Sequence, residues 1–306
     1  MLRPLVLDDV PSCAALLVAR HALHRWEQPL LDPLDQVAAE RAIAALLALD
    51  TAQGAVAVEG GVVTGYLIGA ARPDPTWGRN TWVEAAGCAG ASLPALWASL
   101  AADWVGAGRV AQYVLVPPSL APTFFELGFG IQHVHAARSV TPGSWDARVR
   151  PAVRADIPAL AELELVLQEH LLGSPVFSTL TPVSLADTVR EYEEEFDADQ
   201  QLLVVADVDG AVVGSAVGCD VHKSSGNTGL IAPRASAILG FAAVRPEARG
   251  TGLARALHDA ILAWADELDY PTIVTDWRAA NLEAARAWRG LGYAPSFLRL
   301  HRLVAG

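Results

Sequence analysis

Residues 240–257 read Gly240-Phe241-Ala242-Ala243-Val244-Arg245-Pro246-Glu247-Ala248-Arg249-Gly250-Thr251-Gly252-Leu253-Ala254-Arg255-Ala256-Leu257. An apolar run typical of a buried strand ends at Pro246, and an amphipathic helix follows Gly252. The two glycines of the intervening loop let backbone N–H groups approach a ligand with no Cβ in the way. Such N–H groups at a helix N-terminus favour an anion, and Arg249 adds a positive charge. The pattern predicts a pyrophosphate site, with an ordinary strand-to-helix turn as the alternative.

The sequence contains two similar openings and two similar endings. Residues 2–11 resemble residues 149–158, and Arg150 follows Arg3 by 147 positions (150 − 3). Residues 125–129 resemble residues 289–293, and Gly292 follows Gly128 by 164 positions (292 − 128). A repeat of this kind indicates two copies of one fold. A Pro/Gly/Ser cluster near residues 141–144 separates them, so we expect domains over 1–143 and 144–306.

Both copies show the same order of elements: strand, two helices, a run of strands, helix, strand, helix, strand. The expected helices cover residues 10–25, 35–49, 93–105, a short stretch from 122, 157–172, 185–196, 252–269 and 282–290. The expected inner strands cover residues 55–58, 62–70, 81–86, 111–116, 131–139, 202–208, 211–219, 237–244, 272–276 and 297–303. This order predicts an α/β protein (α+β in strict usage), with a mixed, mostly antiparallel sheet flanked by helices in each copy. Phosphate-loop and dinucleotide-binding glycine motifs are absent, which disfavours nucleotide-binding folds.

Composition excludes several functional classes. The 306 residues carry a net charge of −12, which disfavours contact with nucleic acid. The longest uncharged run, residues 85–102, is rich in Ala, Gly and Ser and contains Pro94, so we expect no membrane span. Three scattered cysteines and an N-terminus without an apolar signal core indicate a cytoplasmic protein. The sequence leaves both a monomer and a homodimer open.

Two segments resemble the motifs of the GNAT (GCN5-related) N-acetyltransferase superfamily, in a tandem-domain arrangement. The run Arg249-Gly250-Thr251-Gly252-Leu253-Ala254 resembles motif A, a strand followed by Arg/Gln-x-x-Gly-x-Gly/Ala. The run from Asn281 to Tyr293 resembles motif B, which has Asn-x-x-Ala, then an aromatic residue, then Gly-Phe. The resemblance covers residues 149–303 well, and residues 2–140 by the order of elements alone.

This resemblance implies an acyl-CoA site with acetyl-CoA as co-substrate and no metal. In relatives, strand backbone groups bond the pantetheine arm, the loop holds the pyrophosphate, and the amine attacks the thioester directly. The residues that the resemblance assigns to the cofactor are Ala242, Ala243, Val244, Arg249, Gly250, Thr251, Gly252, Leu253, Ala254, Asn281 and Trp288.

Trp288 departs from the family pattern, which often has a tyrosine there as the acid for the leaving thiolate. An indole N–H can donate a hydrogen bond but is no acid near neutral pH. Coenzyme A then leaves as a thiolate, another group donates the proton, or catalysis is weak. A base would have to lie within reach of the amine, and the candidates are Asp276, Asp220 and His222, each of which could equally be structural.

Other chemistry-bearing residues have plainer explanations. The acidic run over residues 190–197 could rim the acceptor site or form a solvated helix face. His133 and His135 share one face of a strand, and no further metal ligands are near in sequence, so we expect them to be structural.

The first copy has no arginine in its matching loop, residues 85–92. We therefore expect a degenerate GNAT-like domain that binds no CoA and acts as a scaffold or as one wall of the acceptor site. The predicted function is transfer of an acetyl (acyl) group from acetyl-CoA to the primary amine of a small molecule. The alternatives are a non-catalytic acyl-CoA sensor or scaffold, and acetylation of a protein N-terminus or lysine.

Overall fold

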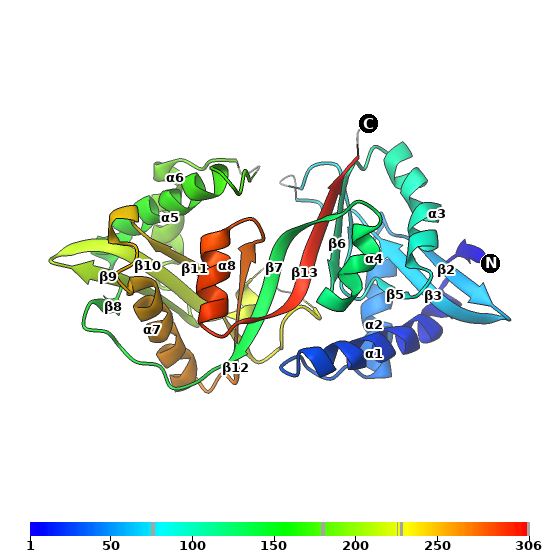
Figure 1. Ribbon diagram of the computed structural model, residues 1–306, viewed down its shortest axis with the longest axis horizontal. Helices are drawn as coiled ribbons and strands as arrows, with labels where there is room; N and C mark the ends of the chain where they lie inside the picture. Colours follow the sequence, from blue (N-terminus) through cyan, green and yellow to red (C-terminus); the bar gives the residue numbers. More distant parts are fainter. Residues whose placement is uncertain (75–76, 179–180, 225, 227–228, 305–306) are drawn as a thin grey trace. The chain divides into compact units, whose positions relative to one another are not determined.

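The computed structural model describes residues 1–74, 77–178, 181–224, 226 and 229–304, and these form two compact units (Figure 1). Unit 1 comprises Met1–His135, Gly229–Ile231 and Pro295–Gly306, whereas unit 2 comprises Ala136–Thr228 and Ala232–Ala294. Each unit therefore includes a segment from the other half of the sequence. The functional division near residue 143 stays a prediction. Within the described residues, no helix is both long and apolar enough to span a bilayer.

Unit 1 begins with strand β1 and two helices. Its elements are β1 Leu2–Pro4, α1 Val10–Glu27, α2 Gln36–Leu47, β2 Gln53–Glu59, β3 Val62–Gly69, β4 Asn80–Val83, β5 Cys88–Gly90, α3 Leu93–Gly106, β6 Ala111–Val116, α4 Ala121–Phe125, the first part of β7 Gly130–Ser139, and nearly all of β13 Ala294–Leu303. One sheet has the order β1-β2-β3-β5, and β4, β6 and β13 are consecutive in a second.

Unit 2 repeats this plan. Its elements are β8 Val149–Pro151, α5 Ile157–Leu172, α6 Leu185–Glu195, β9 Gln201–Val208, β10 Ala211–Asp220, the 3-10 turns η5 Val221–Lys223 and η6 Pro246–Ala248, β11 Ser236–Val244, α7 Leu253–Glu267, β12 Thr272–Arg278 and α8 Leu282–Gly290. Its strands follow the order β12-β11-β10-β9-β8, parallel between β11 and β12 and antiparallel elsewhere. This mixed sheet confirms the predicted fold class.

An ion pair fixes the opening of unit 1. The Arg3 guanidinium donates to both carboxylate oxygens of Asp9, at 2.7 and 2.6 Å, and the Val6 N–H donates to Asp9 at 3.0 Å. These contacts hold the turn that enters α1, and the hydrogen bond from Arg3 holds the pKa of Asp9 below its usual value.

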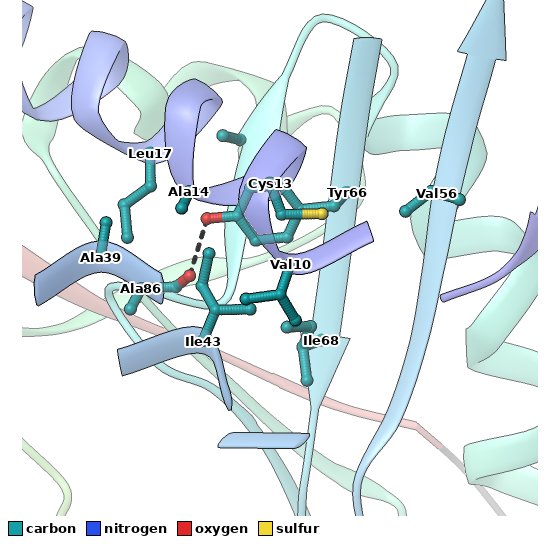
Figure 2. Close-up of a cluster of buried hydrophobic side chains, with 11 residues drawn as sticks. Val10, Cys13, Ala14, Leu17, Ala39, Ile43, Val56, Tyr66, Ile68 and Ala86 are labelled. Carbon is teal, nitrogen blue, oxygen red and sulfur yellow. Dashed lines mark hydrogen bonds between the residues drawn. The ribbon is translucent and has the colours of Figure 1, made fainter. Parts of the chain in front are cut away.

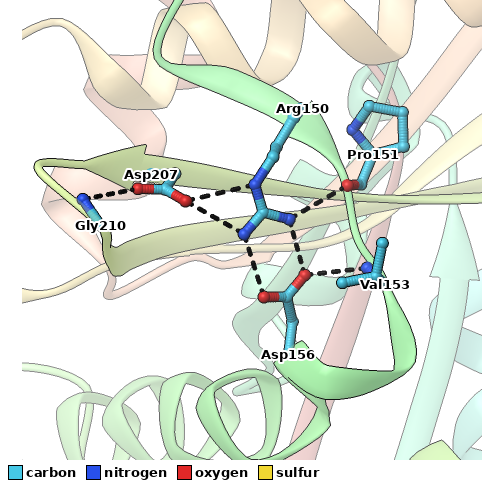
Figure 3. A network of polar contacts seen from close by, with 6 residues as sticks. All are labelled: Arg150, Pro151, Val153, Asp156, Asp207 and Gly210. Carbon is cyan, nitrogen blue, oxygen red and sulfur yellow. Dashed lines mark hydrogen bonds and ion pairs between the residues drawn. The ribbon is translucent and has the colours of Figure 1, made fainter.

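Unit 2 forms the same set of bonds 147 positions later (Figure 3). Arg150 donates to Asp156 at 2.7 and 3.0 Å, and the Val153 N–H donates to Asp156 at 2.8 Å. Arg150 also reaches Asp207 at 3.0 Å, and Asp207 accepts the N–H of Gly210 in the β9–β10 turn at 3.0 Å. The repeat predicted from sequence therefore reproduces individual hydrogen bonds as well as the order of elements.

Helices cover both faces of each sheet. In unit 1, α1 and α2 pack on β2, β3 and β5 around a buried cluster (Figure 2). The members of this cluster are Val10, Cys13, Ala14, Leu17, Ala39, Ile43, Val56, Tyr66, Ile68, Ala86 and Ala89. In unit 2, Val217 of β10 packs against the α5 cluster that contains Leu160, whereas the next residue, Gly218, faces Ile261 and Trp264 of α7. The sheet therefore lies between α5 and α7.

One expected strand is interrupted. Residues 81–86 were predicted as a single strand, but β4 ends at Val83, and β5 begins at Cys88 after a turn in which Gly87 N–H donates to Glu84 O at 2.8 Å. A Cβ on Gly87 would lie 2.8 Å from Ile68 O, and one on Gly90 would lie 2.4 Å from Thr64 O. Both glycines are thus required for close packing against β3.

Candidate functional site

Strand β11 has one edge that is only partly paired. Ser236–Ile238 pair with Thr272–Val274 of β12, and Thr275 Oγ1 then donates to Leu239 O at 2.9 Å. No further pairing of β11 with β12 occurs among the described residues. The register against β10 shifts at Gly240, which is exposed. From Gly240 onward, one side of the strand is therefore available to an extended ligand.

The hydrogen-bonding pattern identifies which backbone groups face that open edge. Arg245 N–H donates to Val213 O on the β10 side at 2.8 Å. Because alternate residues of an antiparallel strand bond to the same neighbour, the backbone groups of Ala243 also face β10. Those of Ala242 and Val244 face away from β10, toward the open edge. Ala242 and Val244 are half-buried, so a ligand can reach them.

The open edge leads into the glycine loop. Gly250 has φ of 77° and Gly252, the N-cap of α7, has φ of 85°, a region that side chains disfavour. A Cβ at either position would meet nothing within 4 Å, so packing does not explain these glycines. Thr251 Oγ1 bonds to Ala248 O at 2.6 Å, and no side chain caps α7. The first N–H groups of α7 are therefore available to an anion.

Arg249 lies beside this loop with its side chain 38% exposed. Its Nε donates to Val244 O at 3.3 Å, and its Nη1 lies 3.4 Å from Glu283 Oε2. The guanidinium thus lies at the end of the open edge, where a diphosphate entering the loop would meet it.

A second arginine on the loop was missed from sequence. Arg148 Nη1 donates to Thr251 O at 3.2 Å, and Asp146 holds the same guanidinium through contacts of 2.9 and 2.7 Å. Arg148 lowers the pKa of Asp146 well below its usual range through these hydrogen bonds. The contact joins residues 103 positions apart, and no local pattern signals it.

Asn281 connects α8 to α5. Its buried side chain accepts the N–H of Ala284 at 3.1 Å and so caps α8. His170 Nε2 lies 3.3 Å from the same Asn281 oxygen, and because an amide oxygen only accepts, Nε2 is the donor. The resemblance of the sequence to motif B points to Asn281 as a cofactor residue, whereas no local pattern points to His170.

Trp288 is buried in an aromatic cluster with His258 and Tyr293. The ring centroids lie 6.4 Å apart for Trp288 and His258, and 6.0 Å apart for Trp288 and Tyr293. Burial lowers the pKa of His258 and raises that of Tyr293. Neutral forms of both side chains are therefore favoured, and the indole adds no ionisable proton.

The three candidate bases lie at two places in unit 2, with Asp220 beside His222 and Asp276 apart from them. Asp220 accepts hydrogen bonds from the N–H of His222 and the hydroxyl of Tyr270, each at 2.8 Å. Burial, and to a smaller extent the hydrogen bond to Asp220, raise the pKa of Tyr270 to about 12. Asp220 faces Ala237, at the start of β11, whereas the glycine loop follows the other end, roughly 20 Å away at about 3.3 Å per residue. Asp276 follows Thr275, where β11 and β12 separate. Asp276 is therefore the candidate nearest the open edge.

The matching region of unit 1 is filled by its own side chains. Arg20 donates to the carbonyls of Ala85 and Cys88, and Tyr66 donates its hydroxyl to Ala86 O at 2.8 Å. The carbonyls of Ala85 and Ala86 lie in the turn between β4 and β5, and Cys88 is the first residue of β5. Arg20 therefore occupies part of the region of unit 1 that matches the open edge of unit 2.

Two other expectations concern charged and metal-ligating side chains. The rings of His133 and His135 lie 6.3 Å apart, and no group of three or more potential metal ligands occurs among the described residues. The acidic side chains of α6 are largely exposed, and Arg190 pairs with Asp187 at 2.7 Å. Whether this helix rims an acceptor site stays a prediction.

A family model matches most of the second half of the chain. Residues 172–293 match the model of the acetyltransferase (GNAT) family. This segment is therefore similar to GNAT acetyltransferase domains. The match includes the glycine loop, Asn281 and Trp288, so the matched segment contains most of the site described above. No curated protein sequence gives a significant match.

Solved structures extend the GNAT fold to the whole chain. A GCN5-related N-acetyltransferase from Sphaerobacter thermophilus matches 100% of this chain and 96% of its own, at 17% identity and a TM-score of 0.60. A GNAT-family acetyltransferase from Colwellia psychrerythraea matches 100% of both chains, at 11% identity and a TM-score of 0.50. A tandem GNAT protein from the clavulanic acid biosynthesis pathway also matches, at 18% identity over 100% of this chain and 99% of its own, with a TM-score of 0.49. The match to the Sphaerobacter thermophilus protein confirms the predicted GNAT fold.

Proposed function

We propose that the GNAT domain transfers an acetyl group from acetyl-CoA to the primary amine of a small molecule. One observation carries the proposal: the open edge of β11 leads directly into a glycine loop at the N-terminus of α7. An extended arm with amide groups is complementary to a strand edge, and a diphosphate is complementary to uncapped helix N–H groups.

The residues present fit this ligand at each point. Ala242 and Val244 offer backbone groups toward the open edge, and Gly250 and Gly252 leave the space above the loop free. Arg249 supplies a positive charge where the open edge of β11 meets the glycine loop. Together these groups would bind the cofactor along β11 with its diphosphate at α7.

When bound, acetyl-CoA supplies an acetyl group on a thioester that an amine can attack directly. The chain then has to position the amine and accept the proton that the nitrogen loses. In this proposal Asp276 accepts that proton, and its position after Thr275, where β11 and β12 separate, supports the assignment. Trp288 offers no acid for the departing sulfur, and a CoA thiol is a fair leaving group without one.

The test is thiol release from acetyl-CoA in the presence of a panel of small amines, with peptides bearing a free N-terminus or lysine as a second panel. We expect turnover with a member of the first panel and none without an amine. Turnover with peptides only would instead identify a protein acetyltransferase.

The buried Trp288 also favours a second candidate, a non-catalytic acyl-CoA sensor. Tight binding of acetyl-CoA without thiol release from either panel would support that function. Absence of CoA binding would refute both.

A further inference from the structure

Arg249 is held by two oxygens of its own unit. Its Nε donates to Val244 O at 3.3 Å, and its Nη1 lies 3.4 Å from Glu283 Oε2. Val244 is one of the two residues whose backbone faces the open edge of β11. The side chain of Arg249 therefore folds back over the end of the edge and is kept there by a carboxylate.

The position of Glu283 has an electrostatic consequence. An anion entering the glycine loop and the Glu283 carboxylate are both attracted by the Arg249 guanidinium. They also repel each other, since both carry negative charge. Binding of a diphosphate must therefore weaken the contact between Arg249 and Glu283.

We propose that Glu283 competes with the cofactor's diphosphate for Arg249 and thereby sets the affinity for CoA. This inference rests on the proposed function, because it assumes that CoA occupies the glycine loop. In the free protein the carboxylate takes the place of a phosphate oxygen at the guanidinium, and cofactor binding exchanges one anionic partner for another.

The surroundings of Glu283 keep the free-energy cost of releasing Arg249 small. Glu283 lies in the first turn of α8 with its side chain 64% exposed. A carboxylate in the first turn of a helix is stabilised by the uncompensated N–H groups of that turn and by water. Glu283 therefore keeps favourable partners after it releases Arg249, and the competition adjusts affinity without preventing binding.

The experiment is calorimetric titration of CoA into the full chain and into the E283Q variant. Exposed ion pairs contribute about 0.2–1 kcal/mol, so we expect CoA to bind E283Q about 1.4- to 5-fold more tightly at low salt. The difference should shrink in about 1 M salt, where the screening length falls to about 3 Å.

The matched control is E247Q, which removes the same charge from exposed Glu247, two residues before Arg249. A double-mutant cycle with R249Q isolates the pair, since the effect of E283Q should fall to that of E247Q in this background. Equal effects of E283Q and E247Q in the wild-type background would overturn the inference while leaving the proposed function intact. Failure of wild-type protein to bind CoA would instead remove the proposed function itself.

Discussion

The substitution G252A, compared with a control substitution at another glycine, distinguishes the cost of backbone strain from an effect on cofactor binding. Gly252 has φ of 85°, and a Cβ there would meet no atom within 4 Å. Gly210, in the β9–β10 turn, has φ of 83° and equally open space, so it is a matched control. A left-handed backbone costs an alanine about 1–2 kcal/mol. Both G252A and G210A should thus lower the melting temperature by about 2–8 °C.

Only G252A should affect the cofactor. The new methyl group would project from the loop whose N–H groups we assign to the diphosphate. Loss of even one hydrogen bond to a charged group costs about 1.5–3 kcal/mol, which is a weakening of roughly tenfold or more. Calorimetric titration of CoA measures this directly. If G252A bound CoA as tightly as G210A, the assignment of the loop to the diphosphate would be wrong.

Three further predictions test separate parts of the account. R249E should abolish CoA binding in a titration, whereas A91E in the matching loop of unit 1 should leave the affinity unchanged; the reverse pattern would assign the cofactor to unit 1. W288F should keep thiol release within about threefold of wild type, because an indole supplies no acid; a loss of a hundredfold would show that the indole N–H takes part in catalysis. R150M should lower the free energy of unfolding by about 1–2 kcal/mol at pH 7, since it removes hydrogen bonds to the buried Asp156 carboxylate from a partly exposed guanidinium. Because Arg150 depresses the pKa of Asp156, the stability contributed by this ion pair is present above about pH 4 and is lost as the pH falls through the lowered pKa. Denaturant unfolding should therefore show that the difference in stability between wild type and R150M shrinks in acid. A difference that stayed constant with pH would contradict this reasoning.

Local sequence patterns were sufficient to predict the repeat and nearly all of the helices and strands. The two openings share an Arg and an Asp at the same spacing, and the structure turns this likeness into the same hydrogen bonds at Asp9 and Asp156. The glycines of the loop were readable because positive φ at Gly250 and Gly252 is a local requirement.

Features that depend on distant residues could not be predicted in this way. The break between β4 and β5 depends on contacts of Gly90 with Thr64, and Arg20 fills the adjacent turn from a helix 68 positions before Cys88. The assignment of the segment from Pro295 to unit 1 likewise reflects strand pairing between β13 and β6. None of these contacts changes the periodicity of the segments that make them.

The candidate site likewise combines features that local sequence predicts with features that depend on distant residues. The loop and the edge of β11 follow from one continuous stretch of sequence, whereas the contact of Glu283 joins α8 to that stretch and the contact of His170 joins α5 to α8. The hydrogen bonds of Asp220 also depend on a distant residue. The position of Asp220 at the end of a strand suggested a candidate base, and its carboxylate accepts hydrogen bonds from Tyr270 and His222.

The most direct measurement is a crystal structure of the full chain with CoA. We expect the diphosphate to lie against the N–H groups of residues 250–254 beside Arg249, and the pantetheine arm to bond Ala242 and Val244 along β11. A diphosphate bound at residues 85–92, or anywhere away from the N-terminus of α7, would contradict the central claim.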